Sequence, residues 1–312
     1  MVGKEYVITT YNIGFGAYNH DFSFFMDQGK MLSGEKVKGK LSKATSKEIV
    51  LTNTRGAIEE ITAFNPDFAF FQEVDTNSTR SFQVNQFKML QESLAKMASV
   101  HVSNFHSAYL FYPILDPHGV VNSGIATFSK YKIDKVIRKS LEITDAFPSK
   151  FFDLDRCFSA SYLKTNHDNY LVIVNVHLSA YDKGGVYRKK QLQQLNSFLE
   201  VEYQKGNYVV CGGDFNHDIA NSMYVFETKQ EKPEWVYALN NDDLNENFSF
   251  ATNNNIPTCR STDMPYEKNV NYTVVLDGFI VSKNVDVIMV ENVDTNFEYS
   301  DHNPVYMKFV LK

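Results

Sequence analysis

Residues 209–218 carry the densest group of side chains suited to chemistry. They read Val-Val-Cys-Gly-Gly-Asp-Phe-Asn-His-Asp, an apolar run followed by two glycines and then by polar side chains at every second position. In extended backbone this period places Asp214, Asn216 and Asp218 on one face. An Asp-x-Asn-x-Asp run also opens an EF-hand calcium loop, but Ile219 stands where that loop requires glycine. Taken alone, the segment fits either a catalytic carboxylate or an ordinary solvated turn.

Five apolar runs of this chain end in Asn, Asp, Glu or His, and an Asp-His pair precedes the last run. Each of these groups alone has a plain structural explanation, such as turn formation or a hydrogen-bonded core histidine. Their recurrence favours function, because strand ends that meet at one rim of a packed sheet pair would bring the groups together. Besides Asp214, the side chains concerned are Asn12, Glu73, His177, Asp277, Asp301 and His302.

The elements that must position these groups are mostly short strands. Runs rich in β-branched and aromatic residues predict strands. Apolar spacing of three and four residues predicts three helices. The predicted strands and helices do not alternate regularly along the chain. This order favours two mostly antiparallel sheets packed face to face with helices outside. The predicted strands are 6–11, 68–71, 124–128, 170–176, 208–211, 274–281 and 305–311, and the predicted helices are 55–64, 84–97 and 187–203.

The domain organisation follows from the same reading. We expect one domain over residues 1–312, because no composition shift marks a boundary. Residues 26–46, rich in lysine and glycine and without periodicity, are expected to form an irregular surface insertion. The aromatic residues Phe22, Phe24 and Phe25 just before it fit either a core cluster or a lip that contacts a lipid or a nucleobase.

Composition and charge limit the functional classes. Hydrophobic residues make up 43% and charged residues 22% of the 312 residues, as in an ordinary globular protein. The formal net charge is −6, which argues against tight sequence-independent binding of duplex DNA. Three widely spaced cysteines without a C-x-x-C motif argue against a disulfide framework and a cysteine zinc site. With no transmembrane segment or signal peptide visible in the sequence, we expect a cytoplasmic protein, unless a leader has been removed.

The ordered motifs resemble the endonuclease/exonuclease/phosphatase superfamily of metal-dependent phosphoesterases, along nearly the whole chain. The most specific are Gly-Asp-Phe-Asn at 213–216 and Ser-Asp-His-Asn-Pro at 300–304. The resemblance implies a four-layer α/β-β/α sandwich of two mostly antiparallel sheets flanked by helices. It also implies that Asn12, Glu73 and Asp301 lie at a Mg²⁺ or Mn²⁺ ion, which prefers oxygen ligands.

The resemblance further implies a catalytic role for five residues. Asp214 would orient or deprotonate the attacking water, and Asn216 would bind a phosphoryl oxygen. His302 would contact the phosphate, with its tautomer fixed by Asp277. His177 would donate a hydrogen bond to the phosphate or to the leaving oxygen.

Three basic residues are candidates for contacts with the substrate. The candidates for phosphate binding are Arg156, Lys183 and Arg188. The alternative is an ordinary ion pair for Arg156 and a solvated basic helix start for Lys183 and Arg188. Abasic-site nucleases usually carry a second acid or amide two residues after the first asparagine, where this chain has Gly14. Inositol 5-phosphatases carry a basic residue next to the aspartate that corresponds to Asp277, and this chain does not. These differences argue against both subclasses.

We therefore expect a phosphodiesterase or nuclease, with nucleic acid as a possible partner. A phosphomonoesterase, a lipid phosphoesterase acting on sphingomyelin or phosphoinositides, and a non-catalytic binding module on the same fold are the alternatives. The oligomeric state is not written in the sequence.

Overall fold

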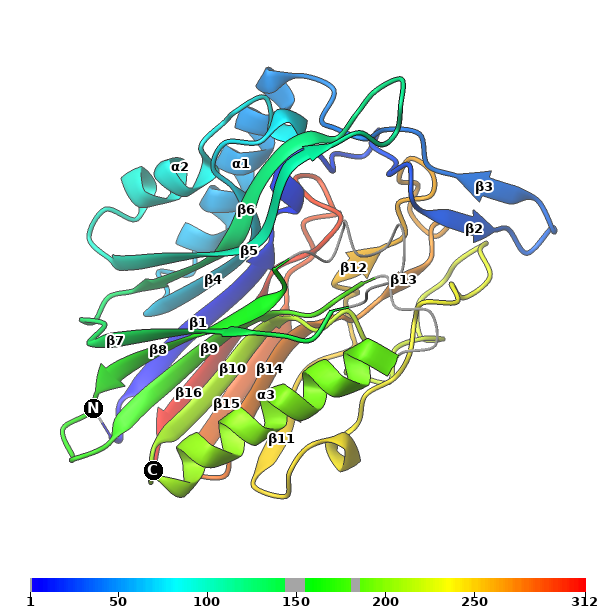
Figure 1. The fold of residues 1–312 in the computed structure, drawn as a ribbon. Coiled ribbons are helices and arrows are strands. Elements are labelled where there is room, and N and C mark those ends of the chain that lie inside the picture. The colour runs from blue at the N-terminus through cyan, green and yellow to red at the C-terminus, as the bar shows by residue number, and fades with distance from the viewer. Residues whose placement is uncertain (1, 144–154, 181–185) are drawn as a thin grey trace.

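The computed structural model describes residues 2–143, 155–180 and 186–312, and it contains two large sheets packed face to face (Figure 1). The first sheet has the order β15 (Val285–Asn292), β16 (Val305–Leu311), β1 (Glu5–Asn12), β4 (Phe68–Asp75), β6 (Gly119–Ser129) and β5 (Ala98–Leu110). The second has the order β11 (Phe248–Ala251), β14 (Asp277–Ser282), β10 (Tyr208–Asp214), β9 (Tyr170–His177), β8 (Cys157–Lys164) and β7 (Lys135–Ser140).

Both sheets follow the same pairing plan. The central pair of each sheet is parallel, β1 with β4 and β9 with β10. The strands outside these pairs are antiparallel to their neighbours. The carboxyl ends of the four central strands lie at one edge of the sandwich, since Asn12 at the end of β1 donates a hydrogen bond to Asp214 at the end of β10. The antiparallel strands β14 and β16 begin at that same edge.

Alternating side chains divide the protein into layers. Phe68 and Phe70 of β4 face the second sheet, while Ala69 and Phe71 face the helices. In β9, Leu171 and Ile173 face the first sheet. Strand side chains alternate between the two faces of a sheet. Gln72 of β4, and Asn175 and His177 of β9, therefore point into the space between the sheets. The predicted four-layer sandwich is confirmed.

Among the described residues, three α-helices cover the outer faces. The loops also carry the 3-10 turns Gly14–Gly16, Thr79–Ser81 and Asn241–Asp243. Helices α1 (Lys47–Thr62) and α2 (Gln86–Ser93) pack on the first sheet, and α3 (Val186–Gln204) packs on the second (Figure 1). Helix α1 begins eight residues before the predicted start, because the Ser46 side chain accepts a hydrogen bond from Ile49 N and caps it. In the part of the chain that the structure describes, no helix is both long and apolar enough to span a bilayer.

The insertion at residues 26–46 is less irregular than its sequence indicates. It contains a hairpin of β2 (Gln28–Lys30) and β3 (Lys36–Lys38), which projects from the sandwich (Figure 1). A second small ribbon, β12 (Cys259–Arg260) with β13 (Thr273–Val274), lies nearby. The preceding aromatic residues Phe22, Phe24 and Phe25 are buried in a core cluster, as in the first of the two predicted alternatives.

A buried amide contact joins the two sheets just below the polar edge. The Gln72 side chain donates from Nε2 to Asn175 Oδ1 at 2.8 Å and to Thr10 Oγ1 at 3.1 Å. Asn175 Nδ2 in turn donates to Ala126 O at 2.9 Å. Both amide side chains are fully buried, so each lost partner would leave an unsatisfied polar group in the interior. These bonds fix the position of one sheet relative to the other.

Candidate active site

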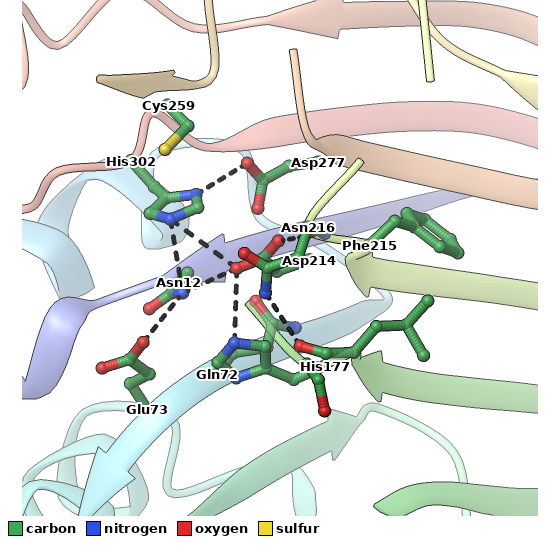
Figure 2. A network of polar contacts seen from close by, with 12 residues as sticks. Asn12, Gln72, Glu73, His177, Asp214, Phe215, Asn216, Cys259, Asp277 and His302 are labelled. Carbon is green, nitrogen blue, oxygen red and sulfur yellow. Dashed lines mark hydrogen bonds and ion pairs between the residues drawn. The ribbon is translucent and has the colours of Figure 1, made fainter. Parts of the chain in front are cut away.

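The polar ends of the inner sheet faces meet in one cluster (Figure 2). Asn12 ends β1, His177 ends β9 and Asp214 ends β10, while Asp277 begins β14 at the same edge. His302 lies in the loop before β16, beside Cys259 in an isolated bridge. All five predicted side chains are buried, although they come from distant parts of the sequence.

Asp214 is the hub of this cluster. Its Oδ2 atom accepts a hydrogen bond from Asn12 Nδ2 at 3.0 Å and lies 3.4 Å from His177 Nε2 and 3.6 Å from His302 Nε2. Its Oδ1 atom accepts from the Asn216 backbone N–H at 2.8 Å. Burial raises the pKa of Asp214 to about 6, and the positive charge of His302 opposes that rise. A carboxylate in this setting can take a proton from a water molecule near neutral pH.

His302 is fixed by a carboxylate behind it. Its Nδ1–H donates to Asp277 Oδ2 at 2.8 Å, which leaves Nε2 directed at Asp214 and Asn12. Burial lowers the pKa of His302, but the carboxylates of Asp277 and Asp214 outweigh it and hold that pKa well above its usual value. His302 therefore carries a proton and offers a positively charged donor at the centre of the site.

His177 has the opposite electrostatic character. Burial, followed by the charges of Arg156, His302 and Arg80, holds the pKa of His177 well below its ordinary value. Its ring is therefore neutral. Its Nδ1 atom is buried without a hydrogen-bond partner among the described residues. Two histidines in one cluster thus have different protonation states because their charged neighbours differ.

The turn after β10 depends on two unusual backbone conformations. Gly213 has φ +144°, and a Cβ atom there would lie 1.9 Å from Val176 O, so the position requires glycine. Asn216 has φ +50°, and its Nδ2 donates to Leu178 O at 2.8 Å. This bond holds the Asn216 side chain at the cavity wall.

Glu73 reaches the site through a bulge. Strand alternation would place Glu73 on the opposite face from Gln72, but a register irregularity lies between Phe71 and Val74, and Glu73 has φ +55°. Its Oε1 atom accepts from Asn12 Nδ2 at 3.4 Å. The bulge therefore turns a side chain predicted to bind metal into the cavity.

The donor set fits a hard divalent cation. Burial raises the pKa of Glu73, and the neighbouring Asp301 carboxylate raises it further despite nearby arginines. Burial likewise raises the pKa of Asp301. Two carboxylates that oppose each other's ionisation in one cavity form a site that a bound cation stabilises. Asn12 presents Nδ2 to Glu73 while its Oδ1 accepts from Gly14 N at 3.0 Å, so its predicted metal contact would use the remaining lone pair of Oδ1.

A second grouping also has metal-binding chemistry. One ligand atom from each of Asp214, Asp277 and His302 lies within 4.8 Å of the others. The hydrogen bond between His302 Nδ1 and Asp277 already occupies one nitrogen of that group. Glu73 and Asp301, which also line the cavity, are therefore the better-placed pair for a cation.

A cavity of about 930 Å³, a volume that includes its open mouth, is lined by Glu73, His177, Asp214, Asn216, Asp301 and His302. Three arginines also line it, of which only Arg156 is among the predicted residues. Arg80 is buried and held by Asp75, with hydrogen bonds of 2.8 and 3.0 Å. Arg260 is buried with its Nε atom lacking a hydrogen-bond partner among the described residues. Guanidinium groups bind phosphate oxygens in paired geometry, so the wall suits an anionic substrate.

Of the other two predicted substrate contacts, the structure describes only Arg188. Lys183 falls outside the described residues. Arg188 is fully buried, and its Nη1 donates to Trp235 O at 2.8 Å and to Asn216 O at 3.2 Å. Arg188 thus supports the backbone of the Asn216 loop, and its substrate contact stays a prediction.

Comparison with known proteins places this geometry in a family. The sequence profile of the Endonuclease/Exonuclease/phosphatase family matches residues 9–302. An inositol phosphosphingolipids phospholipase C from Schizosaccharomyces pombe is 24% identical over 245 residues, which are 69% of this chain. That match spans 58% of the length of the yeast protein.

Solved structures show the same fold at low identity. TDP2 from D. rerio, complexed with a single-strand DNA product, has a TM-score of 0.60 and 12% identity, covering 98% of this chain and 99% of that one. The human Nocturnin catalytic domain with bound sulfate has a TM-score of 0.59 and 17% identity, covering 100% of this chain and 95% of that one.

Proposed function

The chain belongs to the endonuclease/exonuclease/phosphatase family, whose members hydrolyse phosphoesters, and we propose that it is a divalent-metal-dependent phosphodiesterase using an activated water. The observation that carries this proposal is the position of Asp214. Its carboxylate lies between neutral His177 and protonated His302, in a cavity that also contains the Glu73 and Asp301 carboxylates. A base, a positive donor and a cation site thus lie within one pocket.

Each group has a role in the proposed reaction. Asp214 accepts the proton of the attacking water as the new O–P bond forms. The bond between phosphorus and the leaving oxygen breaks in the same reaction, and the leaving oxygen takes up a proton from water. His302, held by Asp277, donates to a phosphoryl oxygen and balances the charge that develops there. His177 and Asn216 are placed to hydrogen-bond to the phosphate or the leaving oxygen. These roles follow the contacts of the side chains and are consistent with the sequence-based assignment.

A divalent ion completes the proposed chemistry. Members of the family generally depend on such an ion. Mg²⁺ or Mn²⁺ held by Glu73, Asp301 and Asn12 would, when bound, neutralise phosphate charge and assist the leaving oxygen. The positive charge of the ion would also favour the ionised form of both carboxylates.

Two substrate classes are candidates. The sequence favours a nucleic acid, and the D. rerio structural neighbour holds a DNA product. The yeast relative is named for action on a phosphosphingolipid, which favours a phosphodiester in a lipid head group as the second candidate. Phosphomonoester hydrolysis and a cytoplasmic location stay predictions.

A hydrolysis panel tests the proposal. The full chain is assayed on plasmid DNA, single-stranded RNA, sphingomyelin, inositol phosphates and bis(4-nitrophenyl) phosphate with Mg²⁺, Mn²⁺ or EDTA. Asp214→Ala and His302→Ala are expected to lower kcat at least about a hundredfold, the usual loss for an acid–base group. His167→Ala and Asp168→Ala, an exposed His-Asp pair, are matched controls that should retain full activity.

Two results would contradict the assignment. Full turnover by Asp214→Ala would remove the proposed base. Binding of a phosphoester by the wild-type protein without turnover on any substrate, with either metal, would instead indicate a non-catalytic module on this fold.

A further inference from the structure

The loop that joins β5 to β6 exposes an unusual group of apolar side chains. Phe111 is 77% exposed, Ile114 83% and Leu115 98%, and the neighbouring Tyr109 and Tyr112 are 45% and 54% exposed. We call residues 109–115 the β5–β6 tip. Contiguous exposed apolar groups of this kind are rare on proteins without a partner for them, because each remains in contact with water. The tip therefore has the character of an interaction surface.

Polar contacts at its base hold the tip in a defined orientation. Ser42 Oγ donates to Asp116 O at 2.7 Å and to Asp116 Oδ2 at 3.0 Å, and Lys43 pairs with the same carboxylate at 2.5 Å. The Tyr112 ring packs on Phe25 with centroids 5.5 Å apart. The insertion thus braces the loop, and Ile114 and Leu115 stay outside the packed region.

The tip lies beside the mouth of the active-site cavity. The strands that lead to it contribute Phe105 and Ser123 to the cavity wall, and His118 at the base of the tip lines it too. The β2–β3 hairpin projects from the same end of the sandwich, opposite the chain termini (Figure 1). The cavity therefore opens next to two projecting loops.

The hairpin supplies positive charge and one more apolar group. Residues 26–46 contain five lysines, in a protein whose total charge is −6. Lys30 and Lys43 are paired with Glu231 and Asp116, so the other three are the lysines available to a partner. Lys36, Lys38 and Lys40 are exposed. Leu32, at the hairpin turn, is 67% exposed. Basic side chains beside exposed apolar ones are the combination that binds anionic membrane surfaces.

We propose that the β5–β6 tip and the β2–β3 hairpin dock this protein on an anionic phospholipid surface, with the tip among the lipid head groups and the lysines on the head-group phosphates. Tyr109, Phe111 and Tyr112 are amphipathic or aromatic residues suited to that interface. Ile114 and Leu115 favour lipid over a nucleic acid, because bases stack on aromatic faces and gain little from aliphatic ones. The flanking lysines favour lipid phosphates over an apolar protein surface.

Docking would bring the cavity mouth to the head groups. That a docked lipid is also the substrate rests on the proposed phosphodiesterase function, whereas the docking itself does not. The two are therefore tested separately.

Vesicle flotation with the full chain tests docking. The vesicles are phosphatidylcholine alone or with phosphatidylserine, and the protein is wild type, Asp214→Ala, or the double variant Ile114→Ser/Leu115→Ser. The double variant is expected to bind at least about tenfold more weakly, since each buried aliphatic side chain contributes about that factor. Lys36→Gln and Lys38→Gln should each weaken binding to phosphatidylserine vesicles about fivefold at low salt.

A matched control places the same change on another face. Val201→Ser/Ile288→Ser removes two side chains that are each 52% exposed, on α3 and β15. This control is expected to bind vesicles as wild type does. Circular dichroism and thermal melting are used to check that both double variants fold.

The outcomes separate docking from catalysis. Vesicle binding that the tip variant loses supports docking even if no substrate is hydrolysed, in which case the proposed function alone fails. The tip variant is also compared with wild type in its turnover of lipid in vesicles and of soluble bis(4-nitrophenyl) phosphate. A tenfold fall in the ratio of the first rate to the second supports the lipid as substrate. Absence of wild-type binding, or equal binding by the tip variant, overturns the proposal. The proposal is also overturned if the wild-type protein forms a dimer or binds an oligonucleotide and the tip variant does not. The tip would then be the contact surface for that partner.

Discussion

Replacing His118 by glutamine is expected to make the protein less sensitive to acid. His118 is 1% exposed, its Nδ1–H donates to Ser42 O, and its Nε2 accepts from Arg80 Nη1 at 3.4 Å. Burial, and then the positive charge of Arg80, lowers the pKa of His118 to about 3 from an ordinary 6.5. Protonation would put two cations side by side and break the contact that helps hold Arg80 at the cavity wall.

The sign and size of the effect follow from proton linkage. Between pH 6.5 and 3 the unfolded chain binds a proton at His118 that the folded protein does not, so stability is present above pH 6.5 and is lost as the pH falls. Each pH unit within that window costs about 1.4 kcal/mol. From pH 7 to pH 5, His118 therefore removes about 2 kcal/mol, a large fraction of a typical folding free energy.

Urea denaturation at both pH values measures this difference. The wild-type protein is expected to lose about 2 kcal/mol more than His118→Gln between pH 7 and pH 5, while other titrating groups contribute equally to both. His167→Gln, at an exposed position, is the matched control and should follow the wild type. If His118→Gln and wild type lose the same free energy, His118 is not buried as a neutral group and the description of its contacts is wrong.

Three further substitutions test other contacts. Asp277→Asn should lower kcat about a thousandfold with the fold intact, because it removes the carboxylate that orients His302; steady-state kinetics with a circular dichroism control measure this. Arg188→Met should lower the free energy of unfolding by about 3 kcal/mol in urea titration, since a buried carbonyl group and a partly buried one lose their donor; a raised KM without a stability change would instead support its predicted substrate contact. Gly56→Ala would normally stabilise a helix, but its Cβ would lie 2.3 Å from the Tyr299 ring, so thermal melting should show a loss of about 1–3 kcal/mol; a higher melting temperature would contradict the packing of Tyr299 on α1.

The strands that bury apolar residues could be predicted from sequence, and strands with polar alternation could not. The last strand was predicted at residues 305–311 and is found there, because its apolar residues face the intersheet core. Strand β5 escaped prediction since histidine, serine and asparagine interrupt its apolar residues. Strand β15 was missed because most of its side chains are exposed at a sheet edge.

Much of the candidate site was predicted for a similar physical reason. Asn12, His177 and Asp214 stand directly after apolar runs, so their sequence position alone indicates a strand end. The direction of Glu73 was beyond prediction, because a backbone bulge sets it. Arg80 and Arg260 stand in polar stretches without a pattern, and only the folded chain shows that both line the cavity.

The buried bond between Gln72 and Asn175 has a consequence for how this protein can change its specificity. Apolar surfaces tolerate sliding, whereas a hydrogen bond between two interior amides has one direction and one length. The bond lies beneath the reacting groups and ties a strand from each half of the molecule. Catalytic alignment is thus determined by the interior, and the outer loops are free to diversify. New recognition segments could be exchanged around the opening without disturbing the chemistry below.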